Sequence, residues 1–167
     1  MRENDIGTII VDSAVELHRN LGPGLLETVY EVTLARSWER RGLAVQRQVA
    51  VPIEYQGETF SEGFRADLIV GGLVIVELKS IERVTPAHKK QLLTYLRLTG
   101  LKLGYLLNFG EALMRDGITR TINGSIDSQP LCLCASVRED PPRPPSGVEK
   151  TESRLSRLHD AVGKKVR

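Results

Sequence analysis

The sequence contains only two cysteines, no long apolar run and no signal-peptide core. Cys132 and Cys134 are too close together to staple a fold, and a C-x-C pair without further ligands is a poor metal motif. No apolar run approaches the roughly 20 residues that cross a membrane, and the first residues lack the apolar segment of a signal peptide. We therefore expect free thiols, no membrane partner and a location in the reducing cytoplasm.

The sequence also lacks a strong net charge, because 23 Lys and Arg stand against 21 Asp and Glu, a formal charge of +2. Residues 1–137 contain 15 basic and 16 acidic residues, a net −1, whereas residues 138–167 contain 8 and 5, a net +3. Bulk charge thus excludes a strongly basic nucleic-acid binder, and any such affinity must come from local patches and a metal. The 167 residues, 41% of them hydrophobic, suffice for one globular domain with a sizeable core.

Two apolar runs within residues 63–80 are interrupted by ionisable residues, among them Asp67, Glu77 and Lys79. The runs meet at residues 71–72, both glycine, and so predict a β-hairpin with Asp67 on its first strand and Glu77 and Lys79 on its second. Burying unpaired charges in such strands costs several kcal/mol, which is comparable to the stability of a whole domain. The charges therefore indicate a site.

The length of the turn decides which residues face each other across this hairpin. A two-residue turn would pair Asp67 with Val76 and place this carboxylate beside apolar side chains. A three-residue turn pairs Val70 with Val74 and Asp67 with Glu77. We predict the second register, with the two carboxylates about 4.5–5.5 Å apart at Cβ. Side chains alternate along a strand, so one face of the first strand is expected to be apolar and to contain Phe64, Ala66, Leu68 and Val70. In the second register this face lies opposite apolar partners.

Two carboxylates at that separation repel each other unless a cation or a proton lies between them. Carboxylate oxygens are the ligands that Mg²⁺ prefers, and a lysine on the same strand face can hold or polarise a bound water. Asp67, Glu77 and Lys79 therefore indicate a metal site for phosphodiester hydrolysis. The alternative is an exposed salt bridge between Lys79 and its acidic neighbours, because E-x-K tripeptides are common.

Asp67 followed by Glu77-Leu78-Lys79 resembles the core motif of the PD-(D/E)xK nuclease superfamily. The resemblance implies a restriction-endonuclease-like α/β fold, in which a mixed β-sheet is flanked by helices. It also implies that Asp67, Glu77 and the backbone carbonyl of Leu78 bind Mg²⁺ or Mn²⁺, and that Lys79 positions the attacking water. The implied partner is nucleic acid, in the first place DNA.

Two helices are predicted before the hairpin, over residues 5–20 and 25–41. Gly24, Glu27 and Tyr30 are similar to the signature of the GxxExxY protein family, which lies near the RecB-like branch of the same superfamily. By this resemblance Glu27 is a third carboxylate at the metal. The alternative is that Glu27 only favours the helix N-terminus, which is worth about 0.3–1 kcal/mol. The core residues expected from the second helix are Leu26, Val29, Ala35 and Trp38.

A third helix is predicted over residues 86–99, with Thr85 as its N-cap. Gln91 and Tyr95 are similar to the Q-x-x-x-Y motif of RecB-like nucleases, which implies that they orient the site and the substrate. The alternatives are that Tyr95 is an amphipathic residue at the core edge and that His88 faces solvent. The candidate substrate contacts are His88, Lys89, Lys90 and Arg65, and the expected core face is Leu92, Leu93 and Leu96.

The predicted sheet begins with an antiparallel meander of three strands, whose first strand contains Pro52 and should lie at an edge or carry a bulge. The strand after the third helix should pair parallel with the second hairpin strand. The expected strands are residues 44–55, 59–70, 73–80, 102–109 and 117–122. The expected units are a nuclease-like domain at 1–124, an extra edge strand within 125–137, and a Pro-rich linker with a disordered basic tail at 138–167.

These features together predict a Mg²⁺- or Mn²⁺-dependent nuclease. One alternative is a binding module that keeps the nuclease scaffold without turnover, which intact Asp67, Glu77 and Lys79 disfavour. Another is a small interaction protein whose polar cluster only specifies the hairpin register, and metal-dependent stabilisation separates it from the other two. The sequence leaves open the oligomeric state and whether cleavage starts from ends or from the interior.

Overall fold

The computed structural model describes residues 1–126, apart from the side chain of Glu62. Its elements follow the chain as α1 (Glu3–Leu21), α2 (Glu27–Arg40), β1 (Val45–Tyr55), β2 (Glu58–Val70), β3 (Val74–Lys79), α3 (Pro86–Thr99), β4 (Leu103–Asn108), α4 (Met114–Gly117) and β5 (Ile118–Ile122). The strand predicted near residues 131–137 and the tail at 138–167 lie outside the described residues.

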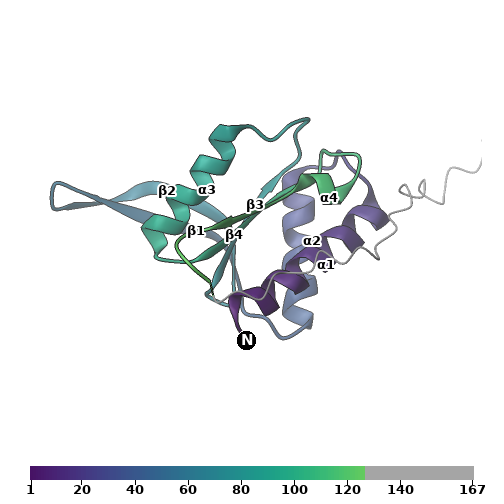
Figure 1. The fold of residues 1–167 in the computed structure, drawn as a ribbon, viewed down its shortest axis with the longest axis horizontal. Coiled ribbons are helices and arrows are strands. Elements are labelled where there is room, and N and C mark those ends of the chain that lie inside the picture. The colour runs from purple at the N-terminus through teal and green to yellow at the C-terminus, as the bar shows by residue number, and fades with distance from the viewer. Residues whose placement is uncertain (127–167) are drawn as a thin grey trace, which may run out of the picture.

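The strands form one five-stranded sheet in the order β1-β2-β3-β4-β5 (Figure 1). β3 and β4 pair parallel, and the other neighbours pair antiparallel, so the predicted mixed sheet is confirmed. β1 lies at the edge, and its pairing with β2 shifts register between Val51 and Ile53, as Pro52 predicts. In Figure 1, α1 and α2 lie on one side of the sheet and α3 crosses the other.

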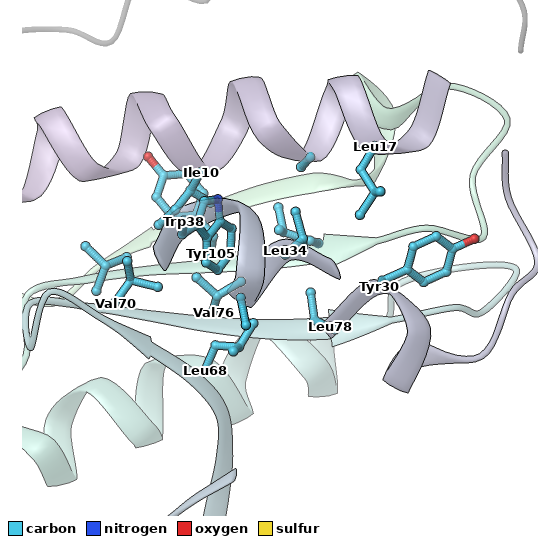
Figure 2. Close-up of a cluster of buried hydrophobic side chains, with 14 of the residues drawn as sticks. Ile10, Leu17, Tyr30, Leu34, Trp38, Leu68, Val70, Val76, Leu78 and Tyr105 are labelled. Carbon is cyan, nitrogen blue, oxygen red and sulfur yellow. The ribbon is translucent and has the colours of Figure 1, made fainter. Parts of the chain in front are cut away.

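The larger core cluster lies between the sheet and the two N-terminal helices (Figure 2). Ile6, Ile10, Ala14 and Leu17 of α1 recur at helical spacing and are buried there. The strands contribute alternate residues, and each fully buried aliphatic side chain is worth about 1.5–3 kcal/mol. The strand residues of this cluster are Leu68, Val70, Val74, Val76, Leu78, Leu103, Tyr105 and Leu107.

The predicted core face of α2 is partly wrong. Leu26 is 75% exposed and Val29 is 39% exposed, whereas Tyr30, Leu34 and Trp38 are fully buried. Trp38 lies nine positions after Val29, which is about two and a half helical turns, so the two side chains point to opposite faces. Leu26 is the N-cap of the helix and lies outside its regular turns.

The second core cluster lies under α3 and contains Leu92, Tyr95 and Leu96 of that helix. Leu92 and Leu96 confirm the predicted face, but Leu93 is only half-buried and Tyr95 takes the third core position. The Tyr95 ring stacks on the ring of Phe64 from β2, with 3.6 Å between centroids. The sheet residues of this cluster are Ala66, Ile69, Ile75 and Leu106.

The prediction of one continuous apolar face on the first hairpin strand is also wrong. Leu68 and Val70 belong to the cluster under α1 and α2, whereas Ala66 and the partly buried Phe64 belong to the cluster under α3. The exchange of faces occurs at Asp67, opposite Gln48 of β1, whose φ of 51° is left-handed. A left-handed residue breaks the strict alternation of a strand, which fits an exchange of faces at this point.

The turn between β2 and β3 has the predicted length. Val70 pairs with Val74 and Leu68 with Val76, so three residues lie in the turn. Gly71 and Gly72 have φ values of 62° and 66°, which glycine adopts without steric cost. The next pair in this register is Asp67 with Glu77, and the turn thereby brings the two carboxylates to the same place.

Candidate active site

Asp67 and Glu77 face each other where β2 begins to leave β3. The backbone ladder between these strands ends at Leu68 and Val76, and side chains continue it. The Asp67 N–H donates to Oε1 of Glu77 at 3.3 Å, and the Leu78 N–H donates to Oδ2 of Asp67 at 2.9 Å. The prediction that the two carboxylates are cross-strand neighbours is therefore confirmed.

The charges of this pair are poorly solvated. Glu77 is 5% exposed, and burial, followed by the charge of Asp67, raises the pKa of Glu77 to about 8. Burial also raises the pKa of Asp67, in spite of the hydrogen bond from Leu78. Two ionised carboxylates here are unfavourable without a cation, because each disfavours the charged form of the other.

Lys79 lies within electrostatic range of the carboxylates, because its charge lowers the pKa of both Asp67 and Glu77. Its Nζ donates to the backbone carbonyl of Leu78 at 3.0 Å. The resemblance implied that this carbonyl binds a metal, and in this structure it accepts a hydrogen bond from the lysine ammonium. A single ammonium offsets only one carboxylate charge, so ionisation of both Asp67 and Glu77 would leave the group with a net negative charge.

Tyr30 shapes the loop that leads into α2. Its hydroxyl donates to the Gly22 carbonyl at 2.8 Å and accepts the Leu25 N–H at 3.1 Å. The ring is fully buried and stacks on Phe109, with 4.0 Å between centroids. Gly24, between the two tied residues, has a φ of 91°, which favours glycine. The spacing of Gly24 and Tyr30 thus has a structural explanation. Gly24 adopts the positive φ that the loop requires, and the Tyr30 hydroxyl holds the loop by two hydrogen bonds.

This loop places Glu27 at the end of β3. The Ser80 N–H donates to Oε1 of Glu27 at 3.1 Å, and the Ser80 hydroxyl donates to the Leu25 carbonyl at 2.7 Å. The charge of Glu27 contributes to the raised pKa of both Asp67 and Glu77. The structure therefore places Glu27 within electrostatic range of the pair, and its part at a metal stays a prediction.

Gln91 and Tyr95 of α3 are joined by a hydrogen bond from the Gln91 amide to the Tyr95 hydroxyl. Tyr95 is 8% exposed, and burial, with the charge of Glu77 adding to it, raises the pKa of its hydroxyl. The hydroxyl therefore stays protonated at neutral pH and lies within electrostatic range of the carboxylates. Tyr95 is at once a core residue and a neighbour of the site.

The four candidate substrate contacts have different surroundings. Nδ1 of His88 accepts the Thr85 N–H at 3.2 Å, so this histidine caps α3. Lys89 and Lys90 are exposed on the first half of α3. Arg65 is exposed, and its Nη1 lies 3.4 Å from the Gln48 carbonyl. Three cationic side chains therefore remain accessible, whereas His88 has a local structural role.

Glu31 and Gln48 belong to the same polar network but were not predicted. Glu31 of α2 is 4% exposed, and it accepts hydrogen bonds from Arg47 Nε at 2.8 Å and Gln48 Nε2 at 2.9 Å. Gln48 Nε2 also lies 3.4 Å from Oδ1 of Asp67. The spacing of Glu31 from Glu27 was a usable signal, because residues four apart share a helix face. No sequence pattern indicates the left-handed backbone of Gln48.

Asn108 was also missed. This fully buried side chain at the end of β4 accepts the Ile81 N–H at 3.0 Å and donates to the Ile81 carbonyl at 2.8 Å. The Phe109 N–H donates to the Lys79 carbonyl at 2.7 Å. These bonds hold the backbone that follows the E-x-K tripeptide, and a Cβ on Gly110 would meet the Ile81 carbonyl oxygen at 2.1 Å. The end of β3 is therefore held from two sides.

Within residues 1–126, no three His, Cys, Asp or Glu side chains converge into a ready metal cage. The carboxylates are instead held by backbone N–H groups. Asp67 and Glu77 still fit a hard divalent cation, because Mg²⁺ keeps several waters and needs only one or two protein carboxylates. The raised pKa of both groups shows that their ionised forms lack a compensating charge, which a divalent cation would supply.

A mixed sheet with helices on both faces, carrying Asp on one hairpin strand and Glu-x-Lys on the next, defines the restriction-endonuclease-like class of α/β proteins. The chain belongs to the PD-(D/E)XK nuclease superfamily, whose family model matches residues 4–121. Searches of curated proteins and of solved structures each gave no match. The superfamily is one of nucleases and points to nucleic acid as substrate, while the finer resemblance to the GxxExxY family and the RecB-like branch stays a prediction.

No helix within residues 1–126 is long and apolar enough to cross a membrane. The longest helix, α1, is amphipathic, and its apolar residues lie against the sheet.

Proposed function

We propose that this protein is a Mg²⁺- or Mn²⁺-dependent nuclease that hydrolyses phosphodiester bonds, with DNA as its substrate. The observation that carries the proposal is the facing pair of Asp67 and Glu77 on neighbouring strands, with Lys79 beside them. A buried carboxylate pair of this kind weakens the fold unless it serves a ligand. The membership of the chain in the PD-(D/E)XK nuclease superfamily also supports phosphodiester hydrolysis.

Asp67 and Glu77 would hold the cation, and Glu27 would support it from the end of α2. When bound, the cation supplies a water of lowered pKa and stabilises charge on the phosphate. The Leu78 carbonyl accepts the Lys79 ammonium at 3.0 Å and keeps a second lone pair with which it would join these ligands. Lys79 would orient the attacking water and offset charge on the phosphoryl oxygens.

Gln91 and Tyr95 would orient the substrate beside the carboxylates. The Tyr95 hydroxyl is held by Gln91 and remains protonated, so it can donate a hydrogen bond to a phosphate oxygen. Lys89, Lys90 and Arg65 are exposed and would bind the flanking backbone. DNA is preferred over RNA because of the resemblance to RecB-like nucleases, and the cytoplasm is the expected location.

A cleavage assay tests this function directly. Labelled DNA and RNA, linear, nicked, single-stranded and circular, are incubated with purified protein in Mg²⁺, Mn²⁺ or EDTA. We expect cleavage of DNA with either cation and none in EDTA. The matched controls are Glu77→Gln, which removes one charge from the pair, and Glu39→Gln, an exposed carboxylate on α2. Cleavage by the Glu77→Gln protein at the wild-type rate would refute the assignment of this site.

A further inference from the structure

Gln48 has an unusual backbone for a residue inside a strand. Its φ of 51° is left-handed, and in the described part of the chain Gln56 is the only other non-glycine residue with a positive φ. Gln56, with a φ of 53°, directly precedes Gly57 in the turn between β1 and β2, where such conformations are common. Gln48 lies between the paired residues Arg47 and Val49, where a left-handed conformation is strained. Such strain persists only where the surrounding contacts hold the residue in place.

The side chain of Gln48 joins two carboxylates from different elements. Its Nε2 donates to Oε2 of Glu31 on α2 at 2.9 Å and approaches Oδ1 of Asp67 on β2 at 3.4 Å. The amide cannot be turned around, because its oxygen would then lie against two carboxylate oxygens. The two neighbouring carboxylates therefore determine that Nε2 of Gln48, and not its amide oxygen, faces Glu31 and Asp67.

Glu31 is itself held in place. Its other oxygen, Oε1, accepts the Arg47 Nε at 2.8 Å, and the side chain is 4% exposed. A buried carboxylate with one hydrogen bond to each oxygen has little freedom to rotate. Glu31 therefore gives Gln48 a rigid anchor, and the chain of contacts runs from Arg47 through Glu31 and Gln48 to Asp67.

Asp67 is contacted at both oxygens by this arrangement. The Leu78 N–H donates to Oδ2 at 2.9 Å, and Gln48 lies at Oδ1. These two donors set the plane of the carboxylate, and each oxygen keeps a further lone pair for a cation. Residues that orient a metal ligand through hydrogen bonds change metal affinity about 10–100-fold when they are replaced.

We propose that Gln48 and Glu31 are positioning residues that orient Asp67 for a divalent cation. Gln48 makes the contact, its left-handed backbone directs the amide, and Glu31 anchors it. The inference rests on the proposed function, because it takes Asp67 as a cation ligand. It assigns to β1 and to the second turn of α2 a part in the site that neither the hairpin motif nor the E-x-K tripeptide contains.

The replacement Gln48→Gly separates positioning from folding. Glycine relieves the left-handed strain, but loss of the amide also leaves Oε2 of the buried Glu31 without its donor, so the two effects oppose each other and the melting temperature without metal should change by no more than about 2–4 °C. The same change removes the amide, so the affinity for Mn²⁺, measured by calorimetry on the protein without substrate, should fall about 10-fold or more. A residue with a purely structural role would change the melting temperature and leave the Mn²⁺ affinity of the folded protein unchanged.

Two further variants complete the experiment. Gln56→Gly relieves the same kind of strain in the hairpin turn, and it should raise the melting temperature while leaving Mn²⁺ affinity at the wild-type value. Glu31→Gln keeps the shape of the anchor but removes its charge, and it should weaken Mn²⁺ binding to a similar extent as Gln48→Gly. Reduced Mn²⁺ affinity in both site variants, with a normal value for Gln56→Gly, supports the positioning role.

The inference and the proposed function fail in different ways. Wild-type Mn²⁺ affinity in both Gln48→Gly and Glu31→Gln, with metal-dependent cleavage by the wild-type protein, overturns the positioning role and leaves the nuclease function standing. A wild-type protein that neither binds Mn²⁺ nor cleaves nucleic acid overturns the nuclease function and this inference together. A lower melting temperature of Gln48→Gly with unchanged Mn²⁺ affinity assigns Gln48 to the fold alone and also overturns the inference.

Discussion

Among the residues of the site, Glu77 has the ionised form that the fold destabilises most. It is nearly fully buried beside a second carboxylate, and both facts favour its protonated form. Asp67 has the same tendency, although the Leu78 N–H and the charge of Lys79 partly oppose it. A protein without metal is therefore expected to hold a proton at this pair near neutral pH.

The stability of the metal-free protein should reveal that proton. Glu77 has an ordinary pKa of 4.5 and a folded pKa of about 8, so the folded state binds its proton more tightly than the unfolded state does. The resulting contribution to the free energy of unfolding is fully present below pH 4.5 and is lost as the pH rises from 4.5 through 8. Each pKa unit corresponds to about 1.4 kcal/mol, so the loss amounts to a few kcal/mol. Urea unfolding in EDTA at several pH values measures it. The decline between pH 5 and 8 should be smaller in Glu77→Gln, and identical pH profiles of the two proteins would contradict the prediction.

Glu27 offers a second residue-scale test, because its two interpretations predict opposite results. A residue that only favours the helix N-terminus should cost well under about 1 kcal/mol when changed to Gln, with cleavage intact. A residue that supports the cation should, as Gln, keep its bond from Ser80 and relieve repulsion at Asp67 and Glu77. We expect unchanged or slightly higher stability without metal and cleavage lower by orders of magnitude.

The control for Glu27→Gln is Glu39→Gln, an exposed carboxylate on the same helix. It should match the wild-type protein in urea unfolding and in cleavage. If Glu27→Gln cleaves DNA as fast as Glu39→Gln does, Glu27 has no part in the site and the hairpin carboxylates act without it.

At the scale of elements, the site depends on loops whose backbone is held by hydrogen bonds from side chains. Tyr30 holds the entry to α2, Ser80 ties that entry to the end of β3, and Asn108 holds the backbone that follows. The contacts of Ser80 and Asn108 join segments that are distant in the chain. The carboxylates on β2, β3 and α2 are therefore positioned by polar contacts at the ends of elements as well as by the sheet.

Tyr30→Phe tests this dependence. The change removes a buried hydroxyl and leaves the Gly22 carbonyl and the Leu25 N–H without it, so we expect a loss of about 1–3 kcal/mol in urea unfolding. Mn²⁺ affinity should also fall, because the loop that places Glu27 is loosened. The control is Tyr55→Phe, whose hydroxyl lies on a 63% exposed side chain and whose loss should be within about 0.5 kcal/mol. Equal losses in the two variants would contradict the proposed role of the loop.

At the scale of the whole molecule, a sheet with a core cluster on each face carries a polar site between its inner strands β2 and β3. β2 contributes to both clusters, Leu68 to one and Ala66 to the other, and Asp67 lies between these two residues. The stability of the fold and the affinity for a cation should accordingly be linked.

Metal binding should therefore raise the melting temperature of the whole protein. A cation at about 100 times its dissociation constant adds about 2.7 kcal/mol to folding, which corresponds to roughly 5–10 °C for a chain of this size. Scanning calorimetry with millimolar Mg²⁺ or Mn²⁺ measures the shift against EDTA. Glu77→Gln should lose most of it, and an equal shift in that variant would show that the ions bind elsewhere.

Periodicity within the sequence was sufficient to predict α1, α2 and α3, the meander of β1, β2 and β3, and the hairpin register. The pairing of β4 with β3 followed from the strand–helix–strand connection, and α4 was not predicted. Apolar residues at helical spacing specify α1, and the match of apolar faces across the glycine turn specifies the pairing of Asp67 with Glu77. Both signals are local, because they depend on residues within one element or one hairpin. The carboxylate pair could for this reason be predicted from the order of the residues alone.

The tertiary structure alone decided the surroundings of that pair. The left-handed backbone of Gln48, the burial of Glu31 and the lysine on the Leu78 carbonyl depend on contacts between distant segments. The same holds for the face of α2, where local apolarity predicted Leu26 and Val29 but packing against the sheet selected Tyr30 and Leu34. The sequence by itself thus determined which strands carry the carboxylates, because alternation along a strand is a local property. Packing between elements determined which groups surround the carboxylates, because it is the sum of contacts that no single segment contains.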